Sequence, residues 1–469
     1  MNRNNFLPHV ALALVLILVA AFAGQVRKWQ RNWQCNKRAV ISRPAVNPPR
    51  EPAREREPHN TEVFVRFRPG VSLETIQSIT DRMNDTIEDE TEAVPGLDVI
   101  EDEDGKDADT LIAEYTALPE VEYAERIYEI KVDEDTDSFK PVVPNDPRFS
   151  EQWALANEGQ QGGKPGADIS AQHAWATTTG SDKVVVAVLD SGVDYTHRDL
   201  AKNIWTRPEN IKAYEDENLG EMDDVHGYNA LNDDGDPMDE NGHGTHCAGI
   251  IGAEGGNNEG ITGVNWTIQI MPLKFMDASG SGTTKDAIEA INYVIDRKKA
   301  GVNVRIISAS WGSTQKSRAL EDVIKKAYDA GILFVAASGN SNVDTDKHPH
   351  YPSSYDVGNI ISVAALDRND LLASFSNFGP RSVHIGAPGK EILSTWLNNE
   401  FRESSGTSMA TPVVAGVAAL VLSRNPKLSV DELRKRLLDS VDKLPSLKGK
   451  VVTGGRINAA KAVDGAWKL

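Results

Sequence analysis

Apolar runs and amphipathic stretches alternate along the chain from about residue 141 onward. The first run is bounded by Lys183 and Asp190, as expected of a strand that is covered on both faces. The apolar runs lie at Val184–Leu189, Ile268–Phe275, Val304–Ala309, Ile332–Ala337 and Ile360–Ala364, with helical spacing at Thr283–Lys298 and Ser317–Ala330. This alternation predicts an α/β fold with a doubly wound, mainly parallel sheet flanked by helices. Such sheets carry their chemistry at the carboxyl ends of the strands.

Residues 61–140 form a second region with shorter elements and a strong acidic excess. The pattern predicts a small α+β unit with strands at Val63–Val65, Leu97–Ile100 and Val121–Val132 and helices at Val71–Met83 and Asp107–Leu118. Residues 61–134 contain twenty-two acidic and six basic side chains. Because its apolar content is thin for this charge, we expect the unit to be marginally stable alone and to gain from a partner surface. An independent acidic domain is the alternative.

The first 60 residues are basic and contain one apolar run, Val10–Gly24, which ends in the small-x-small pattern Ala21-Phe-Ala23. Residues 1–24 are therefore interpreted as a secretory signal peptide. The alternative is an uncleaved membrane anchor, although the run falls short of the roughly 20 residues that span a bilayer; a buried cytoplasmic helix is a more distant third interpretation. Residues 25–60 are rich in proline and charge and read as an extended linker. The basic residues directly after the run argue against easy translocation: Arg27, Lys28 and Arg31.

Composition and net charge exclude several classes of function and of structure. The 469 residues carry a net charge of −19, which gives no basic field for nucleic acid or an anionic membrane surface. The two cysteines, Cys35 and Cys247, lie in different regions and cannot form a disulfide framework. Cys35 also lacks the small apolar residues that precede a lipidated cysteine.

Three residues with complementary chemistry stand at the ends of predicted elements. Asp190 ends the first strand, His243 lies in Asn241-Gly-His-Gly-Thr-His-Cys-Ala-Gly249, and Ser408 lies in Gly406-Thr-Ser-Met-Ala-Thr-Pro412. A serine hydroxyl needs a base to take its proton, and the base needs a carboxylate to fix its tautomer. Each residue alone is more often a helix cap or strand end, but together they indicate a hydrolase triad.

These motifs, in the order Asp, His, Ser, resemble the subtilisin-like serine proteases over about Pro144 to Val463. Cys247 in the histidine motif is most similar to the thermitase and proteinase K branches. The resemblance implies a serine endopeptidase acting on proteins or peptides, with Asp190, His243 and Ser408 as its triad. It also implies that Asn340, in Ala336-Ala-Ser-Gly-Asn340, is the side-chain donor of the oxyanion hole.

The same resemblance implies where substrate binds. Ser310, Trp311 and Gly312 would pair with the substrate backbone, as an added strand does. Ala336, Ala337, Ser338 and Gly339 would form the opposite wall of the primary specificity pocket. Their small side chains predict room for a large apolar side chain. Trp311 and His350 stand where the family more often has an aliphatic and a small residue.

Two sets of oxygen-bearing residues are candidate calcium sites. The spacing of Asn232, Asp234 and Asp236, with Asn229 nearby, has the rhythm of calcium ligands, although position twelve of an EF-hand would be His243. The second set is implied by resemblance to the thermitase branch: Asp146, Asp199 and Asn257, with the carbonyls of Glu254, Glu259 and Ile261. Solvated acidic loops are the alternative for both. Residues 206–225 form an acidic insertion and a third candidate cation loop.

The resemblance also implies a function for the acidic unit, residues 61–140. Subtilases usually carry a small α+β propeptide that assists folding and blocks the site, and residues 121–130 are similar to its last strand. Residues 61–140 are thus interpreted as a propeptide and inhibitor, cleaved within Lys131–Val143, and residues 141–469 as the peptidase domain. A catalytically silent binding or inhibitor protein and a small-ester hydrolase remain as alternatives. Cys247 lies one helical turn after His243, so its thiol is expected beside the imidazole, most simply as a small buried hydrophobe.

Overall fold

The computed structural model describes residues 61–90, 94–128, 140–216 and 220–464. The chain divides into two compact units, residues 1–134 and 135–469, which are described separately below. The signal or anchor segment, the linker and Cys35 lie outside the described residues, as does most of the expected cleavage segment.

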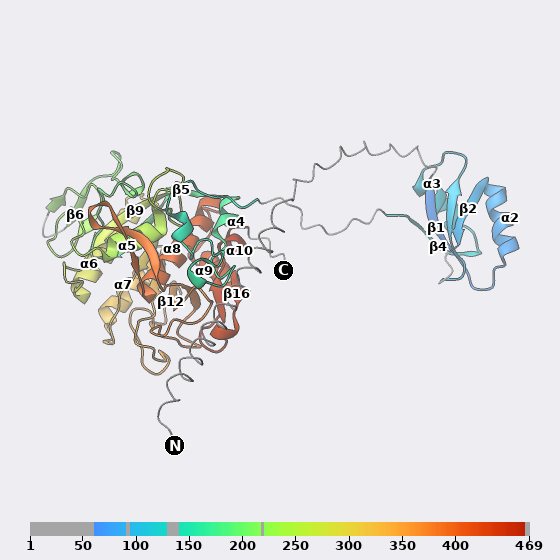
Figure 1. The fold of residues 1–469 in the computed structure, drawn as a ribbon. Coiled ribbons are helices and arrows are strands. Elements are labelled where there is room, and N and C mark those ends of the chain that lie inside the picture. Colours follow the sequence, from blue (N-terminus) through green and yellow to red (C-terminus); the bar gives the residue numbers. More distant parts are fainter. Residues whose placement is uncertain (1–60, 91–93, 129–139, 217–219, 465–469) are drawn as a thin grey trace, which may run out of the picture. The chain divides into compact units, whose positions relative to one another are not determined.

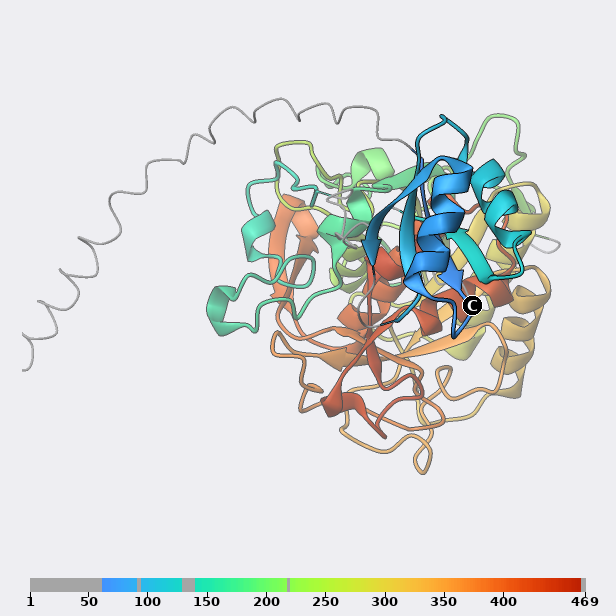
Figure 2. The ribbon, with the colours of Figure 1, turned by 90° about the vertical axis from the view of Figure 1, so that its right-hand side faces the viewer.

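The smaller unit is a four-stranded antiparallel sheet with two helices. The strands β1 (Glu62–Phe67), β2 (Asp85–Glu90), β3 (Leu97–Asp102) and β4 (Val121–Arg126) have the order β2-β3-β1-β4. Helices α2 (Leu73–Met83) and α3 (Ala108–Thr116) lie on the same face (Figure 2), because side chains from both share one buried cluster with alternate residues of β1. The α+β prediction is right, and β2 is the element it missed. Its sequence, Asp-Thr-Ile-Glu-Asp-Glu, is acidic and does not show the apolar pattern that indicates a strand.

A nine-stranded, mostly parallel sheet forms the centre of the larger unit. Its order is β16-β17-β13-β12-β11-β10-β5-β9-β8, and among its strand pairs only β16 with β17 is antiparallel in the described chain. The strands include β5 (Gly180–Asp190), β9 (Thr267–Lys274), β10 (Val304–Ala309), β11 (Leu333–Ala337), β12 (Ile360–Leu366) and β13 (Ile385–Pro388). The shorter strands are β8 (Tyr228–Asn229), β16 (Val441–Lys443) and β17 (Gly455–Ile457). The doubly wound α/β prediction is confirmed.

The strand order reverses at β5. From β5 the chain passes through β8 and β9 on one side and then to β10 on the other, after which β11, β12 and β13 are added outward. Such a switch point opens a crevice at the carboxyl ends of the strands. Asp190 is the last residue of β5 and lies at this crevice.

Helices cover both faces of the sheet (Figure 1). Helices α5 (His243–Gly252) and α8 (Thr407–Arg424) pack on one face, and α6 (Thr284–Lys299) and α7 (Arg318–Asp329) pack on the other. Residues of β5 alternate between the two hydrophobic clusters: Val184, Val186 and Val188 enter one, and Val185, Ala187 and Leu189 the other. This double burial explains why the strand reads as a continuous apolar run.

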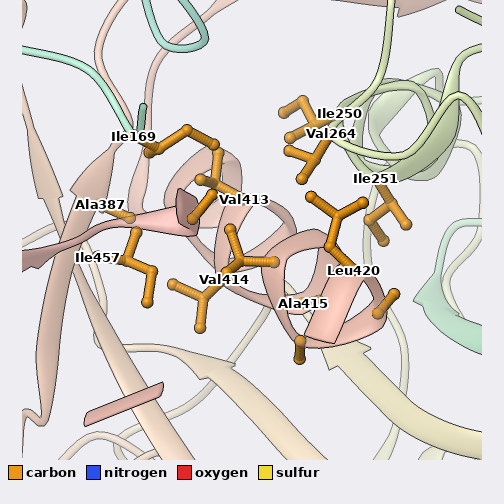
Figure 3. Close-up of a cluster of buried hydrophobic side chains, with 14 of the residues drawn as sticks. Ile169, Ile250, Ile251, Val264, Ala387, Val413, Val414, Ala415, Leu420 and Ile457 are labelled. Atoms are coloured by element: carbon orange, nitrogen blue, oxygen red, sulfur yellow. The ribbon is translucent and has the colours of Figure 1, made fainter. Parts of the chain in front are cut away.

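Helix α8 is the central helix of its layer. Val413, Val414 and Leu420 of α8 belong to the same buried cluster as Ile250 and Ile251 of α5 (Figure 3). In the described part of the chain, α8 alone is long and apolar enough to cross a membrane, and 83% of the qualifying window is buried inside the domain. Its hydrophobicity therefore belongs to the protein core. Packing of α8 against α5 also fixes the spacing between their first residues, which include Ser408 and His243.

The remaining elements are peripheral. They comprise α4 (Ala171–Trp175), α9 (Val430–Asp439) and α10 (Ala459–Asp464), the hairpin of β14 (Ile392–Trp396) with β15 (Glu400–Ser404), and the pair β6 (Tyr214–Asp216) with β7 (Gly220–Met222).

Candidate active site

Asp190 and His243 are joined by a short hydrogen bond. His243 Nδ1 lies 2.7 Å from Asp190 Oδ1, and the carboxylate is fully buried at the end of β5. The same oxygen accepts the backbone N–H of Ser191 at 2.8 Å. Burial acts to lower the pKa of His243, but the charge of Asp190 and the hydrogen bond to it outweigh burial, so this pKa is raised. The pair therefore holds one ring nitrogen protonated and leaves the other available as a base.

Asp239 fixes the start of helix α5, although the sequence analysis did not single it out. Its Oδ1 accepts from Ser191 Oγ at 2.9 Å and from the Gly242 N–H at 3.0 Å. Its Oδ2 accepts the Thr245 N–H at 3.0 Å. A single carboxylate thus ties the residue after Asp190 to the residues around His243. An acidic residue four positions before His243 was the available signal, since acceptors before a helix satisfy its free N–H groups.

Ser408 is the second residue of helix α8. Its hydroxyl donates to the Ser310 carbonyl at 3.0 Å, and no hydrogen bond joins it to His243 in the described structure. Catalytic hydrogen bonds often tighten only when substrate is bound. Ser310 in turn donates from its own hydroxyl to the Ser408 carbonyl at 2.8 Å. These two bonds attach the residue after β10 to the first turn of α8.

Asn340 is oriented by the start of the same helix. Its Oδ1 accepts from the Thr407 N–H at 2.8 Å and the Thr407 hydroxyl at 3.0 Å. The side-chain amide group is thereby left as a donor. A methyl group built on Gly406 would lie 3.4 Å from Asn340 Nδ2 and 3.5 Å from the Ser408 backbone nitrogen. Both donors thus border the same small space, where the helix N-terminus also favours negative charge.

Cys247 lies where the sequence pattern places it. Its thiol is fully buried, and the ligating atoms of Cys247, His243 and Asp190 all fall within 4.8 Å of one another. The thiol also lies 3.5 Å from the Ser408 carbonyl oxygen. Burial raises the pKa of Cys247 well above its usual value, so the group is a neutral thiol rather than a thiolate nucleophile.

A cleft of about 580 Å³ adjoins His243. One side is formed by residues 275–284 and another by Ser310, Trp311 and Gly312. The Trp311 indole donates to the Leu189 carbonyl at 2.9 Å and packs on Phe275 with ring centroids 4.9 Å apart. The expected substrate-pairing edge therefore borders an open groove next to the histidine.

The second predicted wall is attached to helix α8. Ala336 and Ala337 end β11, Ser338 is buried, and the Gly339 N–H donates to the Thr407 hydroxyl at 3.2 Å. Gly339 has φ +100°, and an added Cβ would lie 2.4 Å from Asn377 Nδ2, so the wall turns sharply here.

The second calcium set forms one compact, buried arrangement. Asp199 Oδ1 accepts from Asn257 Nδ2 and Asp199 Oδ2 from the Ile261 N–H, both at 2.9 Å. Asp146 Oδ2 accepts the Gly256 N–H at 2.7 Å, whereas its buried Oδ1 has no hydrogen-bond partner. Burial, with a contribution from the charge of Asp146, raises the pKa of Asp199 to about 7. Two buried carboxyl groups with an unpartnered oxygen fit a cation.

The glutamates of this set use their side chains elsewhere. Glu254 pairs with Lys202, and Glu259 pairs with Arg198 at 3.0 Å. In the described chain the carbonyls of Glu254, Glu259 and Ile261 accept no backbone hydrogen bond. Those carbonyls are the ligands that the resemblance implies, and they remain available.

The first calcium set is arranged differently. Asn229 and Asp234 exchange two backbone hydrogen bonds of 2.9 and 3.2 Å, which close a turn containing Asn232. Asn229 Oδ1 accepts the Leu231 N–H at 3.1 Å, and Asp236 Oδ1 accepts the Tyr195 hydroxyl at 2.9 Å. The side-chain oxygens of Asn229 and Asp236 already accept hydrogen bonds from the protein, so this set offers a weaker argument for a cation.

The acidic insertion at residues 206–225 contains an internal ion pair. Buried Asp224 lies 2.8 Å from Arg207 Nε and 3.2 Å from Arg297 Nη1, and it accepts from the Tyr293 hydroxyl at 2.8 Å. Two arginines thus neutralise this carboxylate, so it is not free to bind a cation.

Comparison with known proteins identifies the family. Residues 181–455 match the subtilase family of peptidases. The chain is 37% identical over 316 residues to thermophilic serine proteinase from Bacillus sp. (strain AK1), covering 67% of this chain and 70% of that protein. It is 36% identical over 322 residues to thermitase from Thermoactinomyces vulgaris, covering 69% of this chain and 99% of thermitase.

A solved protease structure from Pseudoalteromonas arctica PAMC 21717 is also similar, with a TM-score of 0.56 and 29% identity over 69% of this chain and all of that one. The chain belongs to the subtilase family. It is a serine endopeptidase whose substrates are proteins or peptides.

Proposed function

We propose that Asp190, His243 and Ser408 are the catalytic triad of a secreted, self-processing endopeptidase that calcium stabilises. The observation that carries the proposal is the 2.7 Å bond between His243 and the buried Asp190 at the switch point of the sheet. Ser408 begins the helix that packs on the one bearing His243.

In the proposed reaction, Ser408 Oγ attacks the substrate carbonyl while His243 Nε2 takes its proton. The carbonyl π electrons move onto oxygen, where the Ser408 N–H and Asn340 Nδ2 donate to the resulting oxyanion. His243 then gives the proton to the leaving amine as the peptide bond breaks. Water repeats the sequence on the acyl-enzyme and restores Ser408. Asp190 keeps its charge throughout and stabilises the imidazolium.

Residues 61–140 are proposed to act as an intramolecular inhibitor and folding aid. Support comes from the exposed apolar side chains at the end of this unit, Tyr123, Ile127 and Tyr128, of which Tyr128 is 71% exposed. Tyr123 lies in β4 and the other two follow it, and among the described strands β4 is at the edge of its sheet. An edge strand presents unpaired backbone groups on one side. Such an edge can pair with another segment of chain.

Calcium is proposed to bind at Asp146, Asp199 and Asn257 with the three loop carbonyls. The cation would neutralise the carboxylates and hold the loop of residues 254–261 in place. It takes no part in bond cleavage in this proposal. The set at Asn229, Asn232, Asp234 and Asp236 is kept as a second, less supported site.

Secretion is proposed from the N-terminal sequence, with a tether to the outer face of the membrane if residues 1–24 are not cleaved. A catalytically silent protein would not be expected to keep both the base, His243, and the oxyanion donors, Asn340 and the Ser408 N–H. A small-ester hydrolase would be expected to carry the Gly-x-Ser-x-Gly turn, whereas Ser408 is followed by Met409 and Ala410.

Self-processing is tested by expressing the full chain with Ser408→Ala and measuring its intact mass. We expect the variant to retain residues 61–140, while the wild type and the Ser405→Ala control lose them. Ser405 is an exposed serine in the same segment, so it controls for loss of a hydroxyl. Complete maturation of Ser408→Ala in a protease-free preparation would contradict self-processing.

A further inference from the structure

His350 lies between the two segments expected to form the primary specificity pocket. A Cβ added to Gly312 would lie 2.1 Å from His350 Cε1, so the ring is directly against that backbone. A Cβ added to Gly339 would lie 3.0 Å from His350 Cδ2, so the opposite edge of the ring faces the other wall. The imidazole therefore bridges both walls.

Several contacts hold the ring in this position. The Nδ1 atom of His350 lies 3.4 Å from the Ser353 hydroxyl, and the His350 backbone N–H donates to the Ser354 hydroxyl at 3.1 Å. The next residue, Tyr351, exchanges two 2.8 Å backbone hydrogen bonds with Ser313. The segment that carries His350 is thus paired with the residue that follows Gly312.

Both walls also meet the catalytic helix. Ser310 bonds to Ser408, and Gly339 bonds to Thr407, so both expected walls lie beside the first turn of α8 that carries Ser408. We propose that His350 closes the base of this pocket and makes the enzyme prefer substrates with a small residue, such as alanine or serine, before the cleaved bond. This inference rests on the proposed roles of Ser310–Gly312 and Ala336–Gly339 as pocket walls.

The proposal differs from the expectation that the pocket has room for a large apolar side chain. Small side chains on one wall predict space, but a ring inserted from a third segment takes up that space. A phenylalanine of the substrate would have to displace a ring that is packed against two glycines and hydrogen-bonded. Overfilling a packed site is unfavourable, and single methylene differences in a pocket already change rates by about 10- to 200-fold.

The test compares peptide anilides that differ only in the residue before the cleaved bond, either alanine or phenylalanine. Wild type should show the higher kcat/KM with alanine. His350→Gly should raise kcat/KM for phenylalanine relative to alanine by about tenfold or more. His350→Asn, which is shorter but still polar, should give an intermediate ratio. His348→Gly is the control, since His348 is exposed on the same segment and should leave the ratio unchanged.

Titration of active sites with a fluorophosphonate separates the possible failures. Wild type that prefers phenylalanine, or a fully titrating His350→Gly with the wild-type ratio, would overturn the pocket assignment alone. If His350→Gly does not react with the fluorophosphonate, the pocket assignment is tested instead by His350→Asn, through its ratio of kcat/KM for phenylalanine to kcat/KM for alanine. Folded wild type that neither titrates nor cleaves either peptide would instead overturn the proposed triad, and the pocket with it.

Discussion

His243 carries the acid–base chemistry of the proposed mechanism, and its proton affinity depends on Asp190. The imidazole must be neutral to accept the Ser408 proton, so activity is lost as the pH falls through the pKa of His243. The charge of Asp190 raises that pKa against the effect of burial. The low-pH limb of the activity profile therefore reports on this pair.

Replacing Asp190 with asparagine should lower kcat/KM by about 10⁴-fold, because the ring loses its preferred tautomer and the charge that stabilises the imidazolium. The remaining activity should have its low-pH limb at lower pH, since burial then acts on His243 without the opposing charge. The pH dependence of kcat/KM measures both effects. A limb that stays at the wild-type pH would show that Asp190 does not set the pKa of His243.

Asn340 is expected to act only on the transition state. Asn340→Ala should reduce kcat by about 10²- to 10³-fold with little change in KM, because a neutral donor to the oxyanion is removed. Steady-state kinetics on a peptide anilide measures this split. Asn342→Ala is a suitable control, because Asn342 is an exposed asparagine two residues away. Equal losses in both variants would argue for a structural role.

Cys247 offers a chemical probe of the site. A mercurial that reaches its thiol would add bulk beside His243 and move the imidazole away from Ser408. We expect mercury-sensitive activity in the wild type and resistant, nearly normal activity in Cys247→Val. Inactive but folded Cys247→Val would mean that the thiol takes part in catalysis. Wild type that resists mercurials would mean that the thiol is too deeply packed to react.

At the level of elements, the sequence predicts best where burial is uniform. Strand β10 lies at the predicted residues, and α6 and α7 each differ from prediction by one residue at either end. Both faces of a central strand such as β5 are covered, so its apolar run is unbroken. Strand β2 was missed because it is strongly acidic, and β8, β16 and β17 were missed because they are only two or three residues long.

Residues of the candidate site were also predictable only where a local pattern marks them. Asp190, His243 and Ser408 lie in distinctive local motifs at the ends of long elements, so the pattern identifies them. Asp239 and the position of the His350 ring depend on contacts between segments far apart in the sequence. Nothing local in the chain specifies that His350 reaches Gly312 and Gly339 together.

The loop that carries the second calcium set should depend on its cation. Chelation should lower the melting temperature, because a ligand at 100 times its Kd adds about 2.7 kcal/mol to the stability of the native state. Asp199→Ala should melt at the chelated wild-type temperature and respond little to chelator. Asp329→Ala, at an exposed acidic residue of α7, should keep the full response. An unchanged wild-type melting curve after exhaustive chelation would reject an exchangeable calcium.

At the scale of the whole molecule, charge and core size differ between the two units. Among the described residues, the small unit combines an acidic excess with a core cluster of nine buried hydrophobic residues, whereas the large unit buries both faces of a nine-stranded sheet. A small acidic unit with a modest core suits the proposed role of a propeptide that is removed once the enzyme has folded. The intact-mass comparison of Ser408→Ala with wild type tests this division of roles directly.

The central claim is that Ser408 is the nucleophile activated by His243 and Asp190. It is tested most directly by treating the folded protein with a fluorophosphonate and mapping the adduct by peptide mass spectrometry. The account predicts one adduct per active molecule, on Ser408, with strongly reduced labelling in folded His243→Ala. An adduct on a different serine, or no adduct on Ser408 in a folded protein that cleaves peptides, would contradict it.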